Sequence, residues 1–131
     1  MFNYAPVRSA IPTGLAVAAA LLLISSAPVH AADTVDDPEV EHLIQAVGQS
    51  DCVFIRNGKR HAAPDAADHL RLKYRKGKKY IDGADEFIDK LASESSWTGK
   101  PYSIECPGSP AVASKDWLRQ ELSEFRLEES S

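Results

Sequence analysis

Hydrophobic residues return every third or fourth position in four segments of the chain, which is the spacing of a helix that buries one face. The four predicted helices span residues 38–47, 64–77, 83–92 and 115–126. Asp37 before Pro38 is typical of a helix start, and Gly48 suits the end of the first helix. Asp82 and Ser114 are the expected caps of the third and fourth helices.

Three shorter segments have the β-branched and alternating residues that favour strands, over residues 52–56, 59–62 and 102–106. Asn57-Gly58 separates the first two and predicts a tight hairpin turn, because both residue types tolerate positive φ. Residues 107–113 are rich in Pro and Gly and are expected to form a loop. The predicted fold is α+β, with about four helices packed on a small three-stranded antiparallel sheet.

The first 31 residues have the pattern of a secretory signal peptide. A continuous apolar run covers residues 15–24 and precedes Val29-His30-Ala31, a small-x-Ala cleavage pattern. About ten apolar residues are well short of the roughly 20 that span a bilayer, although an uncleaved anchor stays an alternative. We therefore expect a periplasmic protein with no membrane span after cleavage. Its parts would be a flexible leader over 32–37, one domain over 38–126 and a frayed tail over 127–131.

The chain has two cysteines, and in an exported protein they are most simply one disulfide. A Cys52–Cys106 bridge would close a loop for which the chain-entropy relation gives a stabilisation of about 4 kcal/mol. The two residues do not form a C-x-x-C motif, so a reactive thiol pair is not expected.

The formal net charge is −4, which argues against nucleic acid as the main partner. The charge is nevertheless divided into blocks along the chain. Residues 32–55 carry six acids and no bases, residues 56–79 carry nine bases against two acids, and residues 80–131 carry eleven acids against five bases. A basic middle of charge +7 therefore lies between two acidic parts of charge −6 each.

Several segments resemble the YfeK-like family of small exported bacterial proteins of unknown function, in a consistent order over about residues 39–126. The segments that carry the resemblance are residues 54–58 (FIRNG), 66–71 (AADHLR) with Lys73-Tyr74, 87–92 (FIDKLA), Ser95-Ser96, 99–102 (GKPY) and Trp117-Leu118. The resemblance implies a periplasmic protein. It supplies no activity, ligand or catalytic residue.

The basic second helix and the loop before the third strand are the candidate binding surface. The predicted ligand-binding residues are His69, Arg71, Lys73, Arg75, Trp97, Lys100 and Tyr102. Such a surface would suit an anionic envelope component or another, acidic, periplasmic protein. Two ordinary explanations compete with this one. The cations would complement the helix end and the acidic parts of the chain, and Trp97 and Tyr102 would close the core.

Catalysis, metal binding and assembly are the other classes to weigh. A hydrolase would use His69 as base with Ser95 or Ser96 as nucleophile, but no motif places these residues together. The histidines are scattered and the cysteines belong to the disulfide, so we expect no metal and no cofactor. Leu72 lies opposite the apolar stripe of its helix and would be the contact of an assembly subunit. The sequence favours a non-enzymatic binding or accessory domain.

Overall fold

The computed structural model describes Gly14 and residues 35–131. Apart from that glycine, the predicted signal peptide lies outside the described residues, so it stays a prediction. Within the described residues, no helix combines the length and the apolar character that crossing a membrane requires.

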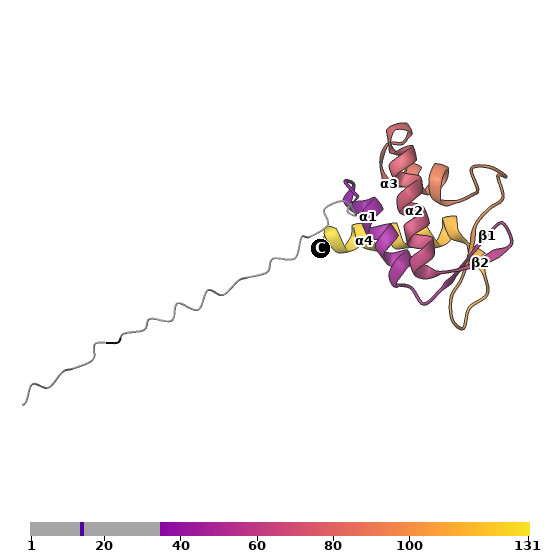
Figure 1. Cartoon of the computed structure of the whole chain (residues 1–131), viewed down its shortest axis with the longest axis horizontal. Coiled ribbons are helices and arrows are strands. Elements are labelled where there is room, and N and C mark those ends of the chain that lie inside the picture. The colour runs from indigo at the N-terminus through magenta and orange to yellow at the C-terminus, as the bar shows by residue number, and fades with distance from the viewer. Residues whose placement is uncertain (1–13, 15–34) are drawn as a thin grey trace, which may run out of the picture. The chain divides into compact units, whose positions relative to one another are not determined.

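Helices and a small antiparallel sheet make up the described domain, which confirms the predicted α+β class (Figure 1). In chain order the elements are α1 (Pro38–Gln49), β1 (Val53–Arg56), β2 (Lys59–Ala62), α2 (Ala63–Gly77), η2 (Lys78–Tyr80), α3 (Gly83–Glu86), η3 (Phe87–Ala92), β3 (Ser103–Glu105), β4 (Val112–Ala113) and α4 (Ser114–Glu129).

The sheet has four strands in the order β2-β1-β3-β4, and each neighbouring pair is antiparallel. Asn57 and Gly58 turn the β1–β2 hairpin with φ of 50° and 76°, the positive values that their sequence predicts. The prediction of three strands was one short. The strand β4 is only two residues long and both are exposed. It therefore lacks the alternation of buried and exposed residues that predicts a strand, and it was predicted as part of the Pro/Gly loop.

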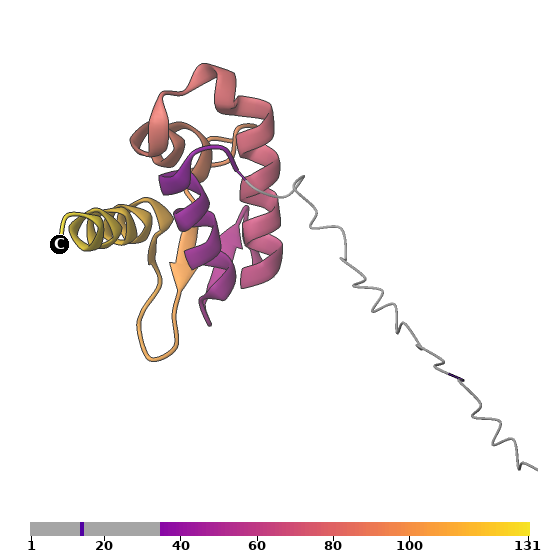
Figure 2. The ribbon, with the colours of Figure 1, turned by 90° about the vertical axis from the view of Figure 1, so that its left-hand side faces the viewer.

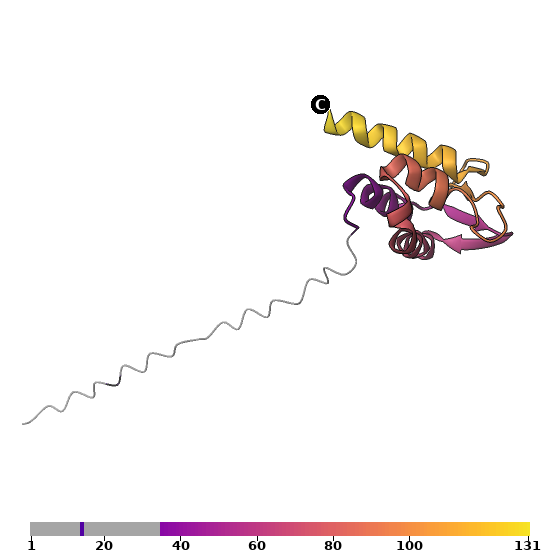
Figure 3. The ribbon, with the colours of Figure 1, turned by 90° about the horizontal axis from the view of Figure 1, so that it is seen from above.

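The helix α1 lies between α2 and α4, as two perpendicular views show (Figures 2 and 3). Its predicted stripe of Val40, Leu43, Ile44 and Val47 is completely buried. Asp37 caps α1 as predicted, because its carboxylate accepts the amides of Glu39 and Val40 at 2.9 and 3.1 Å. Most of the other predicted core positions are also buried, whereas Leu91, Trp117 and Phe125 are only partly buried.

Gly48 does not cap α1, because the helix continues to Gln49 and Ser50 follows as its C-cap. A Cβ on Gly48 would lie 3.1 Å from the Cβ of Ala67 on α2. The glycine therefore allows α1 and α2 to approach closely. Its role is in helix packing and not in helix termination.

The third and fourth helices differ in detail from the prediction. One turn of α-helix in α3 is followed by the π-helical turns of η3, and Asp82 makes no side-chain capping bond. Ser114 is the first residue of α4 and is buried, while Ala113 holds the cap position. The helix α4 then continues to Glu129, through most of the segment predicted as a frayed tail.

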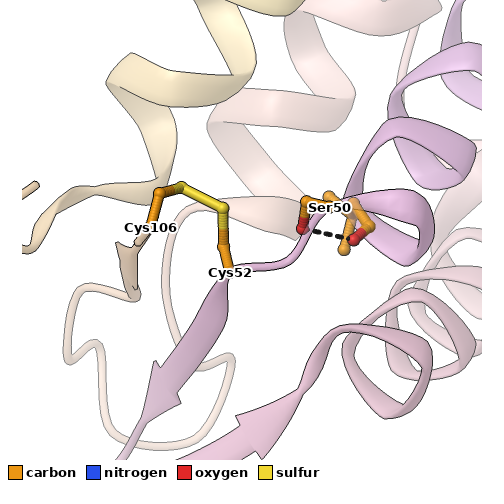
Figure 4. The surroundings of a disulfide bond; sticks show 4 residues. Ser50, Cys52 and Cys106 are labelled. Atoms are coloured by element: carbon orange, nitrogen blue, oxygen red, sulfur yellow. Dashed lines mark hydrogen bonds between the residues drawn. A yellow bond between two sulfur atoms is a disulfide. The ribbon is translucent and has the colours of Figure 1, made fainter. Parts of the chain in front are cut away.

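The predicted disulfide joins Cys52, just before β1, to Cys106, just after β3 (Figure 4). Val53 pairs with Glu105 in the sheet, so the bridge extends this strand pair by one position. The bond lies at the end of the sheet where the chain enters β1 from α1, and α2 lies within the loop that it closes.

Candidate functional site

A groove of about 410 Å³ lies along the exposed side of α2. Its walls come from α2, η2 and η3, the β1–β2 turn and the loop of residues 95–102. The lining residues are Arg56, Asn57, His69, Leu72, Lys73, Lys76, Gly77, Tyr80, Leu91, Ser95, Ser96, Trp97 and Tyr102. This set contains three permanent cations and no carboxylate. The groove therefore carries positive charge in a chain whose net charge is −4.

Three large apolar side chains are exposed at the groove. The exposed fractions are 97% for Trp97, 70% for Tyr80 and 39% for Leu72. The expectation that Trp97 closes the core is therefore wrong, whereas Tyr102 is 8% exposed and does pack into the interior. Leu72 borders the groove, and no second protein face is needed to explain its place on α2. An open groove lined by aromatic rings and cations has the composition of a binding site.

A hydrogen-bonded loop presents Trp97. The buried Ser95 hydroxyl accepts the amides of Trp97 and Thr98, each at 3.3 Å. The Thr98 hydroxyl donates to Asn57 Oδ1 at 2.9 Å, which ties the loop to the β1–β2 turn. Gly99 has a φ of 67°, which allows its amide to return to the Ser95 carbonyl at 2.9 Å. These bonds fix the loop although the Trp97 ring itself is in solvent.

Lys73 is held at the floor of the groove. Its Nζ donates to the Glu94 carbonyl at 2.9 Å and to the Tyr102 hydroxyl at 3.4 Å, and it lies 5.1 Å from the centroid of the Tyr102 ring. Burial lowers the pKa of Lys73, and the nearby Arg56 lowers it further. Burial raises the pKa of Tyr102, so its hydroxyl stays protonated and can donate.

His69 lies beside Tyr102, with its ring edge-on and 6.4 Å between centroids. Burial lowers the pKa of His69 to about 4, with smaller effects of the cations of Arg56 and Lys73 and of His61. His69 is therefore neutral near pH 7. Its Nε2 is buried and has no hydrogen-bond partner among the described residues.

Internal ion pairs account for only part of the basic block. Three of its nine cations pair with carboxylates in the described residues: Arg60 with Glu105, Lys78 with Asp36, and Arg71 with Glu41 and Asp68. The groove cations Arg56 and Lys76 form no ion pair with a described residue. Balance of the acidic parts of the chain therefore accounts for only three of the nine cations in the basic block.

The structure brings four of the seven predicted ligand-binding residues into the groove: His69, Lys73, Trp97 and Tyr102. Arg71, Arg75 and Lys100 do not line it. The prediction missed Arg56, Asn57, Lys76 and Tyr80. A helical signal could have found two of these, because positions 69, 73, 76 and 80 follow the four- and three-residue steps of one helix face.

The geometry gives little support to catalysis or metal binding. Ser95, Ser96 and His69 all line the groove, but neither serine hydroxyl forms a hydrogen bond with His69 in the described residues. The Ser95 hydroxyl is already used as a loop acceptor. The described part of the chain also holds no group of three His, Cys, Asp or Glu side chains that could bind a metal ion.

Fold and site together define a small disulfide-linked α+β domain with an amphipathic, basic groove. The chain belongs to a family of unknown function, DUF5329, whose model matches residues 34–126. It is also similar to the uncharacterised protein YfeK of Salmonella typhimurium strain LT2, with 44% identity over 68 residues. That match spans 51% of this chain and 57% of the relative, so it covers little more than half of either. No solved structure matches the chain. The predicted membership of a YfeK-like family of unknown function is confirmed.

Proposed function

We propose that the chain is a non-enzymatic accessory domain of the periplasm that binds an anionic saccharide in this groove. The observation that carries the proposal is the joint presence of unpaired cations and exposed aromatic rings on one concave surface. Arg56, Lys73 and Lys76 would receive the phosphate or carboxylate of the ligand. Trp97 and Tyr80 would pack against the C–H face of a sugar ring, which is apolar and flat.

A saccharide suits the groove better than an acidic protein does. Ser96 and Asn57 also line the groove, and their hydroxyl and amide groups would bond to hydroxyls of the ligand. The ordered Trp97 loop offers one rigid ring, whereas a protein interface usually has a larger apolar core. We therefore propose a saccharide as the ligand, and binding to an acidic protein is an alternative result that the experiment would reveal.

The disulfide supports an oxidising location, because such bridges persist mainly outside the cytosol. Together with the predicted signal peptide over residues 1–31, this favours export to the periplasm. The ligand would then be a component of the bacterial envelope or a free sugar phosphate in the same compartment.

Titration with α-D-glucose 1-phosphate and with glucose, followed by NMR chemical shifts, tests the proposal. We expect the phosphate ester to bind and glucose to bind at least about fivefold more weakly, because one ion contact in a partly exposed groove contributes about 1 kcal/mol or more. Lys76→Glu should weaken binding of the phosphate ester by about tenfold. Shifts should concentrate at Trp97 and Tyr80.

Arg75→Glu is the matched control, because Arg75 lies beside Lys76 on α2 without lining the groove. It should leave affinity within about twofold. Equal loss in both variants would show that general positive charge, and not the groove, attracts the ligand. Equal binding of glucose and its phosphate would contradict the proposal, and so would the absence of binding to both glucose 1-phosphate and micelles of lipopolysaccharide.

A competition experiment distinguishes a saccharide phosphate carried by a lipid from a free sugar phosphate. Micelles of purified lipopolysaccharide carry saccharide phosphates on a lipid, and glucose 1-phosphate carries one without a lipid. If excess glucose 1-phosphate releases the protein from the micelles, one groove recognises both. If the protein binds only micelles, and Lys76→Glu abolishes this, the lipid-borne saccharide is the ligand. Binding to an acidic protein but to neither saccharide probe would overturn the proposal.

A further inference from the structure

A second, smaller chamber of about 30 Å³ lies behind one wall of the groove. Arg56, His69 and Tyr102 line both spaces, so these three side chains form the boundary between them. The far side of the chamber is mostly apolar and belongs to the core, with Leu118 among its residues. The chamber therefore adjoins the groove, and these three side chains separate the two spaces.

Three buried polar atoms around this chamber have no hydrogen-bond partner among the described residues. They are His61 Nε2, His69 Nε2 and Ser114 Oγ, and their three residues all line the chamber. Ser114 is only 2% exposed, so its hydroxyl is removed from bulk solvent. Buried polar atoms are almost always paired in folded proteins, because an unpaired one has lost its hydrogen bonds to water without a replacement. Three on one small chamber point to a group that enters it.

The size and charge of the chamber restrict what that group is. About 30 Å³ accommodates roughly two water-sized groups, and therefore two or three non-hydrogen atoms at most. His69 is neutral, and a neutral imidazole nitrogen and a serine hydroxyl each need a partner that donates or accepts. A hydroxyl does both, whereas a carboxylate or phosphate is too large and would lose its hydration among apolar side chains.

We propose that this chamber is a subsite that receives a hydroxymethyl group of the saccharide bound in the groove, with Ser114, His61 and His69 as its hydrogen-bond partners. The methylene would pack against the apolar lining, and the hydroxyl would reach the three polar atoms. The inference rests on the proposed function of the groove. It adds a specificity element, because the groove cations recognise the charge of the ligand and the chamber recognises one of its hydroxyls.

The experiment compares α-D-glucose 1-phosphate with its 6-deoxy analogue on the wild-type chain, by the same NMR titration. The two probes have the same phosphate and ring and differ only in the hydroxyl of the hydroxymethyl group. We expect the 6-deoxy probe to bind about five- to tenfold more weakly, which is the usual effect of one or two neutral hydrogen bonds. Signals of Ser114 and His61, which line the chamber and not the groove, should move more with the parent probe than with the analogue.

Ser114→Ala should weaken the parent probe and bring the two affinities within about twofold of each other. Ser123→Ala is the matched control, because Ser123 is exposed on the same helix and lines neither space. Circular dichroism and thermal melting confirm that each variant is folded, and the wild-type comparison of the two probes needs no substitution.

Equal affinity of both probes for the wild type would overturn the subsite while the groove proposal stands. The same holds if the chamber contains only ordered water. In that case Ser114→Ala would change the melting temperature and leave the ratio of the two affinities unaltered. Failure of both phosphates to bind would overturn the subsite, and failure of the lipopolysaccharide micelles to bind as well would overturn the groove proposal with it.

Discussion

His69 shows how a single side chain connects the fold to the site. It projects from α2, a helix that the core requires, yet it lies between the groove and the inner chamber. Cations and burial both disfavour its protonated form, so it offers a neutral nitrogen where the surrounding charge is positive. A protonated imidazole there would add a charge that no described carboxylate compensates.

This environment predicts a pH dependence of stability. The pKa of His69 is about 4 in the folded chain and 6.5 in an ordinary setting. Below pH 6.5 the unfolded chain binds a proton that the folded chain does not, so the free energy of unfolding falls as the pH is lowered. After allowance for partial solvent exposure, we expect a loss of about 1 kcal/mol between pH 7 and pH 5.

Urea unfolding at several pH values checks this, with His69→Gln as the comparison because glutamine does not titrate. Every other side chain is the same in both proteins, so the difference between the two curves reports on His69. The variant should lose about 1 kcal/mol less than the wild type over the same interval. Parallel curves for the two proteins would show that His69 has an ordinary pKa.

For single residues, the sequence predicted which side chains belong to the site better than it predicted how exposed they are. Lys73 and Tyr102 were predicted site residues, and a basic helix beside an aromatic loop was enough to find them. The opposite burial of Trp97 and Tyr102 was not predictable, because both are aromatic residues near one loop. The loop that carries Trp97 is held by bonds of Ser95 and Thr98 to Asn57, which lies about 40 positions away in the sequence.

Among the elements, α1 and α2 pack closely at a glycine of α1. Ala67 faces Gly48, and both are small, so the two backbones approach where larger residues would separate them. This pairing orients α2 and therefore the groove that follows its exposed side. A cap prediction from the glycine alone missed the contact, because a glycine near a helix end is typical of both roles.

Gly48→Val should destabilise the domain by about 2–3 kcal/mol, because even a Cβ at this position lies 3.1 Å from the Cβ of Ala67. Gln49→Val is the control. Gln49 is exposed on the same helix, so valine there reduces helix propensity without a contact to α2. Chemical denaturation of both variants measures the difference. A loss in Gly48→Val no larger than in the control would mean that α1 and α2 adjust freely.

The elements that were not predicted are those without a periodic signal. The strand β4 has two residues, and the π-helical η3 continues the apolar spacing of α3 closely enough to read as one helix. The inner chamber depends on both of these regions, since Ala92 ends η3 and Ser114 follows β4. A chamber formed where five elements meet, namely β1, β2, α2, η3 and α4, leaves no pattern in any one of them.

Charge gives the whole molecule its asymmetry. Where described carboxylates of the acidic parts form ion pairs, their partners are bases outside the groove. One example is Arg126 of α4, which pairs with Glu39 of α1 and Asp85 of α3. Such pairs hold the helices together at the surface and leave the cations of the groove available. The block pattern of the sequence predicted this imbalance, although not which cations would stay unpaired.

The disulfide acts on the same scale, because it joins the chain on both sides of α2, η2, α3 and η3. Replacing both Cys52 and Cys106 with alanine should lower the free energy of unfolding by about 3–4 kcal/mol, mainly by releasing a loop of sequence separation 54 in the unfolded chain. The strand pair β1–β3 still holds the two ends together in the folded state. We therefore expect affinity for glucose 1-phosphate to stay within about twofold wherever the variant is folded.

Urea unfolding with and without a reductant checks the origin of this effect. The reduced wild type should match the double variant, and the reductant should not change the variant further. If instead the folded variant lost its affinity for glucose 1-phosphate, the bridge would be shaping the groove itself. Its role would then lie in the geometry of the folded state, and a restraint on the unfolded chain would no longer explain it.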